Sequence, residues 1–212
     1  MRRLGRAIRA TAAVAGLAAA GVALVVAGLS PQPPEPAPVP EPFVIAADQL
    51  PPAEPAPAAV GVPNRLTIES LGVDAPLLPG EVSGLSLRLP SDPALLTLHT
   101  DGGQPCGDQG TVLIAGHVSS YGTKGVLWPL HAIKPGATAH VTCADGTLTT
   151  WQATGVRLER KADLPQNVFD AAGDRRLVIV TCGGPVMADG HYRDNVIATF
   201  TETTARGQQA AD

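Results

Sequence analysis

Short apolar runs rich in β-branched residues alternate with Gly, Pro, Asp and Asn between residues 64 and 203. This pattern predicts strands rather than helices. The predicted strands are Arg65–Glu69, Leu95–His99, Thr111–Gly116, Thr138–Cys143, Leu148–Leu158, Leu177–Thr181 and Asn195–Thr201. Helical pattern is confined to one or two turns near Val126–His131 and Leu164–Phe169. Seven or more short strands with tight connections predict an all-β domain, a closed or nearly closed β-barrel.

The N-terminal pattern is different. Residues 11–29 contain no charge, and 19 residues rising ~1.5 Å each would span about 28 Å, close to the hydrocarbon thickness of a bilayer. Four arginines precede this run, which predicts a cytoplasmic basic segment at 1–10, a transmembrane anchor at 11–29 and the rest of the chain outside. A cleaved signal peptide is the alternative, and it also exports the remainder.

Residues 30–63 form a proline-rich segment that holds 12 of the chain's 21 prolines. Proline fixes φ and removes a hydrogen-bond donor, so we expect an extended spacer, with a disordered tether as the alternative. Either would hold the domain at 64–203 away from the membrane. Residues 204–212 are predicted to be a polar tail.

Charge and cysteine content limit the possible partners. Without the four N-terminal arginines the chain holds 11 basic and 19 acidic residues. This acidic body argues against nucleic-acid binding, which requires clustered Lys and Arg. Three cysteines predict one pair and one free thiol in an exported protein, and Cys106 and Cys143 could form a disulfide. The chain has no CxxC or HExxH spacing, so no metal site and no cofactor are predicted.

The free thiol with the most informative surroundings is Cys182. It follows the apolar run LVIVT and precedes Gly183-Gly184. We therefore expect Cys182 at the end of a buried strand, where the glycines would let an extended substrate approach the backbone. The alternative is a small buried side chain without chemistry.

A second strand, TVLIAG, is followed by His117. Thiolate is the nucleophilic form of cysteine, and a nearby imidazolium lowers the thiol pKa and can protonate a leaving amine. His117 and Cys182 are 65 positions apart, so they meet only if their strands are parallel neighbours. His191 is the alternative imidazole, although no strand end positions it. The other histidines are interpreted as solvated or structural, namely His99, His131 and His140.

Arg193 lies in the segment GHYRDNVIATF, 11 residues after Cys182. If the strands around these residues are antiparallel neighbours, Arg193 shares an edge with Cys182. Its guanidinium could then stabilise an oxyanion or hold the substrate backbone. A surface ion pair with Asp194 or Asp189 is the alternative.

A strand ending in GH, a later strand ending in TC and an arginine before the final strand together resemble the sortases. The arrangement GH…TCGG…GHYRDN is similar to class E or F, with F the closer. The resemblance covers residues 64–200 and implies an eight-stranded barrel with short helices after an N-terminal transmembrane helix. It implies His117, Cys182 and Arg193 as catalytic residues. Apart from the resemblance, Thr181 is a candidate substrate-binding residue that could support the site through its hydroxyl or backbone. Val178 departs from the TLxTC pattern of many sortases, which affects the expected sorting motif.

The resemblance also implies a reaction. A sortase cleaves an LPxTG-like C-terminal sorting signal after Thr and transfers the secreted protein, through a thioester, to an amine acceptor of the cell wall. The enzyme would sit at the cell membrane as a single-pass protein with its catalytic domain outside. Alternatives are a cysteine hydrolase, an L,D-transpeptidase (although the SHGC-like stretch is missing) and a tethered binding domain without catalysis.

Overall fold

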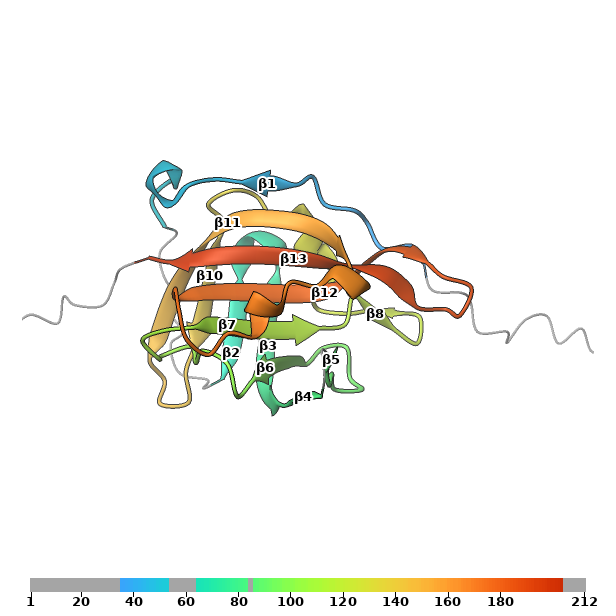
Figure 1. Cartoon of the computed structure of the whole chain (residues 1–212), viewed down its shortest axis with the longest axis horizontal. Coiled ribbons are helices and arrows are strands. Elements are labelled where there is room, and N and C mark those ends of the chain that lie inside the picture. The colour runs from blue at the N-terminus through green and yellow to red at the C-terminus, as the bar shows by residue number, and fades with distance from the viewer. Residues whose placement is uncertain (1–34, 54–63, 84–85, 204–212) are drawn as a thin grey trace, which may run out of the picture. The chain divides into compact units, whose positions relative to one another are not determined.

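The computed structural model describes residues 35–53, 64–83 and 86–203. The predicted anchor at 11–29 and the polar tail at 204–212 lie outside these residues. Within the described part of the chain, no helix is long and apolar enough to cross a membrane. The described residues form strands and short 3-10 helices (Figure 1).

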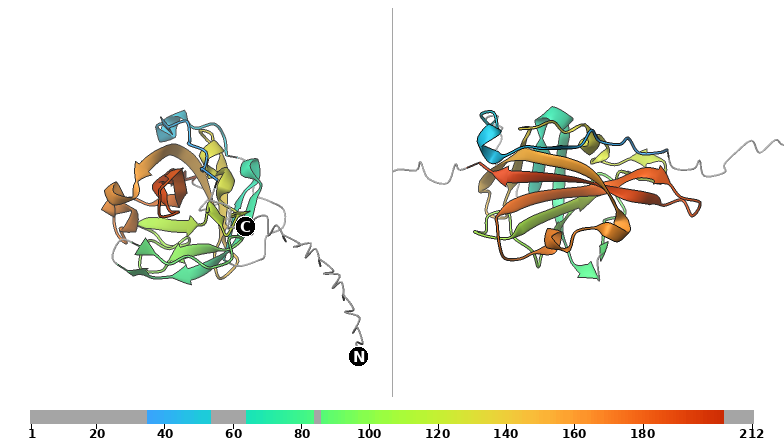
Figure 2. Two further views of the ribbon diagram at one scale, coloured as in Figure 1. Left: turned by 90° about the vertical axis from the view of Figure 1, so that its right-hand side faces the viewer. Right: turned by 45° about the horizontal axis from the view of Figure 1, so that its top comes forward.

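Eight strands close into a barrel, because β13 pairs with β11 as well as with β12. The sheet order is β11-β10-β2-β3-β6-β7-β12-β13. Two neighbouring pairs, β3–β6 and β7–β12, are parallel and the others are antiparallel. Figure 2 shows the strands curving around a common centre. The bounds are β2 (Arg65–Ile68), β3 (Val73–Gly80), β6 (Leu96–His99), β7 (Thr111–Gly116), β10 (Thr138–Thr142), β11 (Leu148–Arg160), β12 (Arg176–Val186) and β13 (Tyr192–Glu202).

The predicted all-β barrel is therefore confirmed, and all seven predicted strands are present, β7 with the predicted bounds and the other six with shifted ends. Strand β3 was not predicted individually. It contains Pro76 and Pro79, which cannot donate to a sheet ladder, and an exposed Asp74. Its alternate residues are nevertheless buried in the barrel, so its inward face fits the period of a strand.

The core fills the inside of the barrel with aliphatic side chains and two aromatic rings. Trp151 and Phe200 are the largest fully buried side chains, and they come from β11 and β13. Because the strands close on one another, the barrel leaves few unpaired strand edges.

Short elements connect the strands. The predicted helical turns appear as η3 (Trp128–Ala132) and η5 (Gln166–Phe169). The remaining short elements are η1 (Ala47–Gln49), η2 (Glu69–Leu71), η4 (Lys161–Asp163), and the strand pairs β4–β5 (Val82–Ser83, Ser86–Leu87) and β8–β9 (Ser119–Ser120, Thr123–Lys124).

The described part of the proline-rich segment, residues 35–53, lies along the barrel. Strand β1 (Phe43–Val44) pairs with β11, and the amide of Gln152 donates to the carbonyl of Pro51 at 2.7 Å. The hydroxyl of Tyr192 donates to the carbonyl of Glu35 at 2.7 Å. Residues 35–53 therefore contact the barrel, which differs from the disordered tether that was the alternative to an extended spacer, because proline-rich backbone still offers carbonyl acceptors.

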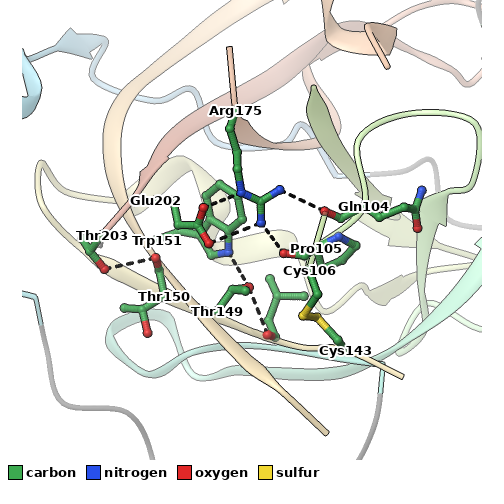
Figure 3. A network of polar contacts seen from close by, with 11 residues as sticks. Gln104, Pro105, Cys106, Cys143, Thr149, Thr150, Trp151, Arg175, Glu202 and Thr203 are labelled. Carbon is green, nitrogen blue, oxygen red and sulfur yellow. Dashed lines mark hydrogen bonds and ion pairs between the residues drawn. A yellow bond between two sulfur atoms is a disulfide. The ribbon is translucent and has the colours of Figure 1, made fainter. Parts of the chain in front are cut away.

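One end of the barrel is tied together by a group that we call the clamp, shown in Figure 3. The disulfide Cys106–Cys143 joins the loop before β7 to the end of β10, with a Cα–Cα distance of 6.2 Å. Arg175, directly before β12, pairs with Glu202 at the end of β13. The Arg175 guanidinium also donates to the carbonyl of Gln104 at 3.0 Å. It lies over the Trp151 ring, 4.7 Å from the ring centroid.

Candidate active site

Strands β7 and β12 bring His117 and Cys182 to the same edge of the sheet. The parallel register pairs Gly116 with Thr181, so the next residue on each strand is His117 and Cys182. The buried Thr181 hydroxyl donates to the Gly116 carbonyl at 2.8 Å and ties the two strands together there. The parallel arrangement expected from the sequence is thus present, and Thr181 has a structural bond in addition to lining the neighbouring pocket.

Strand β13 brings Arg193 to the same edge from the other side of β12. The antiparallel register pairs Cys182 with Asn195 and Gly183 with Asp194, and Arg193 is the next residue along β13. Both strands are longer than predicted. Cys182 lies inside β12, which continues to Val186, and Arg193 lies inside β13 rather than before it. A register shift between Gly183 and Val186 allows this extension, because a bulge bends a strand without ending it.

The two glycines after Cys182 are required by packing, which corrects the interpretation that they leave the backbone open to substrate. A Cβ on Gly183 would lie 2.7 Å from Val196 Cγ2. Gly184 has φ +72°, a left-handed conformation that disfavours other residues, and a Cβ there would lie 2.4 Å from Asp194 Oδ2. Protein atoms therefore fill the space beside both glycines.

The Cys182 thiol is free and half-buried. On one side it contacts a cluster of buried side chains that includes Val118 and Tyr192, and Ala37 of the N-terminal segment belongs to the same cluster. On another side it borders a pocket of about 440 Å³. The pocket lining is mainly apolar and includes Leu87, Leu89, Leu113, Leu164, Val168, Phe169 and Val180.

His117 is half-buried, and its Nε2 lies 2.8 Å from the carbonyl oxygen of Pro90. A carbonyl only accepts, so Nε2 carries the proton in this arrangement. Nδ1 is then the ring nitrogen left for proton exchange. Among the described residues, the hydrogen bond of this imidazole goes to the loop before β6 and not to the Cys182 thiol. Sequence reasoning did not identify Pro90, because nothing in its local pattern marks it.

The other candidate imidazole, His191, lies in the exposed turn between β12 and β13. The turn is closed by hydrogen bonds from the Met187 amide to the His191 carbonyl and from the Gly190 amide to the Met187 carbonyl. The His191 amide donates to Asp189. These contacts fix the turn and give the His191 ring no strand-end position.

Arg193 makes the ion pair with Asp194 that was the alternative to a catalytic role. Its Nε and Nη2 each lie 2.8 Å from a different oxygen of the carboxylate. The Arg193 side chain is 41% exposed, whereas that of Asp194 is 2% exposed. The hydrogen bond to Arg193 holds the pKa of Asp194 below its usual value despite the opposing effect of burial. Asp194 also raises the pKa of Arg193, which stays charged.

The two cysteines of the clamp are not available as thiolate ligands for a metal ion. Cys106, Cys143 and Asp145 lie together there, but the two sulfurs are joined in the disulfide. A disulfide sulfur offers no thiolate ligand. This confirms the predicted arithmetic of one pair and one free thiol, and the free thiol is that of Cys182.

Comparisons with known proteins agree with this geometry. A family model described as a sortase domain matches residues 66–202. Among solved structures, the sortase C2 of pilus island 1 from Group B Streptococcus is similar at 15% identity and a TM-score of 0.50, over 68% of this chain and 77% of that one. A sortase C1 of Streptococcus agalactiae is similar at 12% identity and a TM-score of 0.53, over 68% and 69% of the two chains. None of the curated proteins compared with the chain matches it.

Proposed function

The chain belongs to the sortase family of cysteine transpeptidases, and we propose that it cleaves an LPxTG-like signal at the C-terminus of secreted proteins and joins them to an amine of the cell wall. The observation that carries this proposal is the apolar pocket that borders Cys182. A pocket lined by leucine, valine and phenylalanine suits the leucine and proline of such a signal. It would hold the peptide with its threonine carbonyl at the thiol.

The residues at this edge divide the reaction between them. The Cys182 thiolate attacks the carbonyl carbon of the substrate threonine, and Arg193 donates hydrogen bonds to the resulting oxyanion. The C–N bond to the following glycine then breaks, and His117 as an imidazolium gives its proton to the leaving amine. A thioester between threonine and Cys182 remains.

The second half of the reaction reverses the proton transfer. The acceptor amine attacks the thioester carbon and loses a proton to the His117 imidazole. The C–S bond breaks and the Cys182 thiolate is restored. Water in place of the amine would give hydrolysis instead, so the identity of the acceptor decides between transpeptidase and hydrolase products.

The sequence supports a finer assignment. The arrangement GH…TCGG…GHYRDN is the basis for proposing a class E or F enzyme. The uncharged run at 11–29, with arginines before it, is the basis for proposing a single-pass membrane protein with its N-terminus in the cytoplasm. Secreted proteins with sorting signals would then be its partners outside the cell.

The test is to incubate the protein with an LPxTG-containing peptide and an excess of a glycine-based amine, and to identify the products by mass spectrometry. We expect a peptide cut after threonine and joined to the amine, and no product from Cys182→Ala. A product ending only in a free threonine carboxylate would assign the protein as a hydrolase. Equal product from Cys182→Ala would contradict the proposal.

A further inference from the structure

Asp194 is a buried carboxylate at the edge of the site, and the reaction described above gives it no role. It lies in the middle of a row across three strands, since its register partners are Arg160 on β11 and Gly183 on β12. The residue is 1% exposed. A carboxylate in this position requires partners, because burial of an unpaired charge is strongly unfavourable.

Its partners come from every element packed against it. Arg193, on the same strand, donates to both carboxylate oxygens. Arg160 at the end of β11 and Lys161 in η4 add positive charge that favours the ionised form. On β12 the carboxylate lies against Gly184, where a Cβ would come within 2.4 Å of Asp194 Oδ2. The chain directly after Cys182 is thus shaped around this carboxylate.

The contact with Arg193 has a definite orientation. Nε and Nη2 form one edge of the planar guanidinium, and both are bound to Asp194. A fork of two parallel hydrogen bonds fixes the plane of the group as well as its position. The donors of Nη1 lie outside this fork. An arginine that is 41% exposed would otherwise sample many rotamers.

We propose that Asp194 is a positioning residue, which holds Arg193 by its Nε–Nη2 edge and so presents the Nη1 edge to the substrate in one orientation. This inference rests on the proposed function of Arg193. It also explains why Gly184 follows Cys182 so closely, because only a residue without a Cβ leaves space for the carboxylate.

The kinetic test compares Asp194→Asn with Asp189→Asn, which removes the charge of an exposed carboxylate in the neighbouring turn. We expect Asp194→Asn to lower kcat by about 10-fold to 100-fold with little change in KM, since the missing interaction belongs to the transition state. Asp189→Asn should stay within about twofold of wild type.

A double-mutant cycle separates positioning from general structural support. In an Arg193→Ala background, Asp194→Asn should lower kcat by less than about twofold, because the group that it positions is gone. If the fold-decreases in kcat of the two single variants instead multiply in the double variant, the proposal is overturned, because Asp194 would then act independently of Arg193.

A third measurement uses the wild-type protein alone and does not depend on enzyme activity. The Nε–H of Arg193 in the wild-type protein should give an NMR signal separate from those of mobile arginines. On acidification it should persist below the ordinary aspartate pKa of about 3.9 and disappear as Asp194 protonates. Because the pKa of Asp194 is lowered in the folded protein, the ion pair is present at pH values above that pKa and is lost as the pH falls through it. A mobile signal at neutral pH would overturn the proposal, whereas absent turnover beside an ordered signal would count only against the proposed function.

Discussion

The two ends of the barrel are built on the same three strands but differ in how tightly they are tied. At the clamp, a disulfide joins the loop before β7 to the end of β10, and an ion pair joins Arg175, directly before β12, to Glu202 at the end of β13. The side chains of Arg175 and Glu202 are 12% and 18% exposed. At the other end, the same strands carry a free thiol, a half-buried imidazole and a partly exposed arginine, and the thiol borders a pocket. Figure 1 shows β7, β12 and β13 side by side between these ends.

The difference indicates a division of roles along each strand. The clamp fixes the positions of the strands at one end of the barrel. The parallel pairing of β7 with β12 keeps the two strands in register as far as Gly116 and Thr181 at the other end. The polar groups at the open end can then be accessible to a substrate without loss of alignment. Substitutions at the open end should therefore affect turnover, whereas substitutions at the clamp should affect stability.

The largest effect is expected at Arg193. Both Arg193→Ala and Arg193→Lys should lower kcat by about 10²-fold to 10³-fold, because an ammonium lacks the planar fork of donors. Arg175→Lys at the clamp is the matched control, and it should lower the melting temperature while leaving kcat within about twofold. Steady-state kinetics and a thermal melt of each variant test the comparison. Near-normal turnover in Arg193→Ala would remove Arg193 from the site.

A smaller effect is expected from the disulfide. Replacing both Cys106 and Cys143 with serine should reduce the free energy of unfolding by about 2–4 kcal/mol, because the bond closes a long loop in the unfolded chain. Denaturant titration measures this change. Below the melting transition, labelling of Cys182 by a thiol reagent should keep its wild-type rate. A large change in that rate in the folded variant would show that the two ends are not independent.

The smallest effect is expected from the N-terminal segment. A chain that begins at Asn64 lacks the bonds from Tyr192 to Glu35 and from Gln152 to Pro51. It also lacks the pairing of the two-residue strand β1 with β11. Each of the two bonds contributes about 1 kcal/mol, so we expect a loss of at least about 2 kcal/mol relative to a chain that begins at Pro34. Thermal melts of the two chains, both without the uncharged run, test this. Equal melting temperatures would mean that residues 35–53 contribute nothing to stability.

Sequence patterns predicted the fold where local signals were strong. The run TVLIAG gives β7 with the predicted bounds, because its β-branched residues and flanking turn agree. Strand β3 was missed because its prolines and Asp74 oppose the pattern, and only pairing with β2 and β6 decides its structure. The sequence predicted that the strand ends at Thr181, whereas β12 continues to Val186, because a bulge lets the strand continue beyond Gly183 and Gly184.

At the site, the sequence predicted three candidate catalytic side chains but not their surroundings. His117, Cys182 and Arg193 follow recognisable strand patterns. The pocket is assembled from residues between Leu87 and Asn195 that are far apart along the chain, and no local pattern marks them. Asp194 was recognised only as an ion-pair partner, because its burial depends on three strands meeting.

Cys182 at the open end is the nucleophile in the proposed reaction, and one measurement tests this role directly. The wild-type protein is treated with a chloromethyl ketone built on an LPxT peptide, digested without reduction and mapped by mass spectrometry. We expect one adduct, on Cys182, with Cys106 and Cys143 still joined, and no adduct in Cys182→Ala. A protein that cleaves the peptide but carries the adduct elsewhere, or that still cleaves it after Cys182→Ala, would contradict the account.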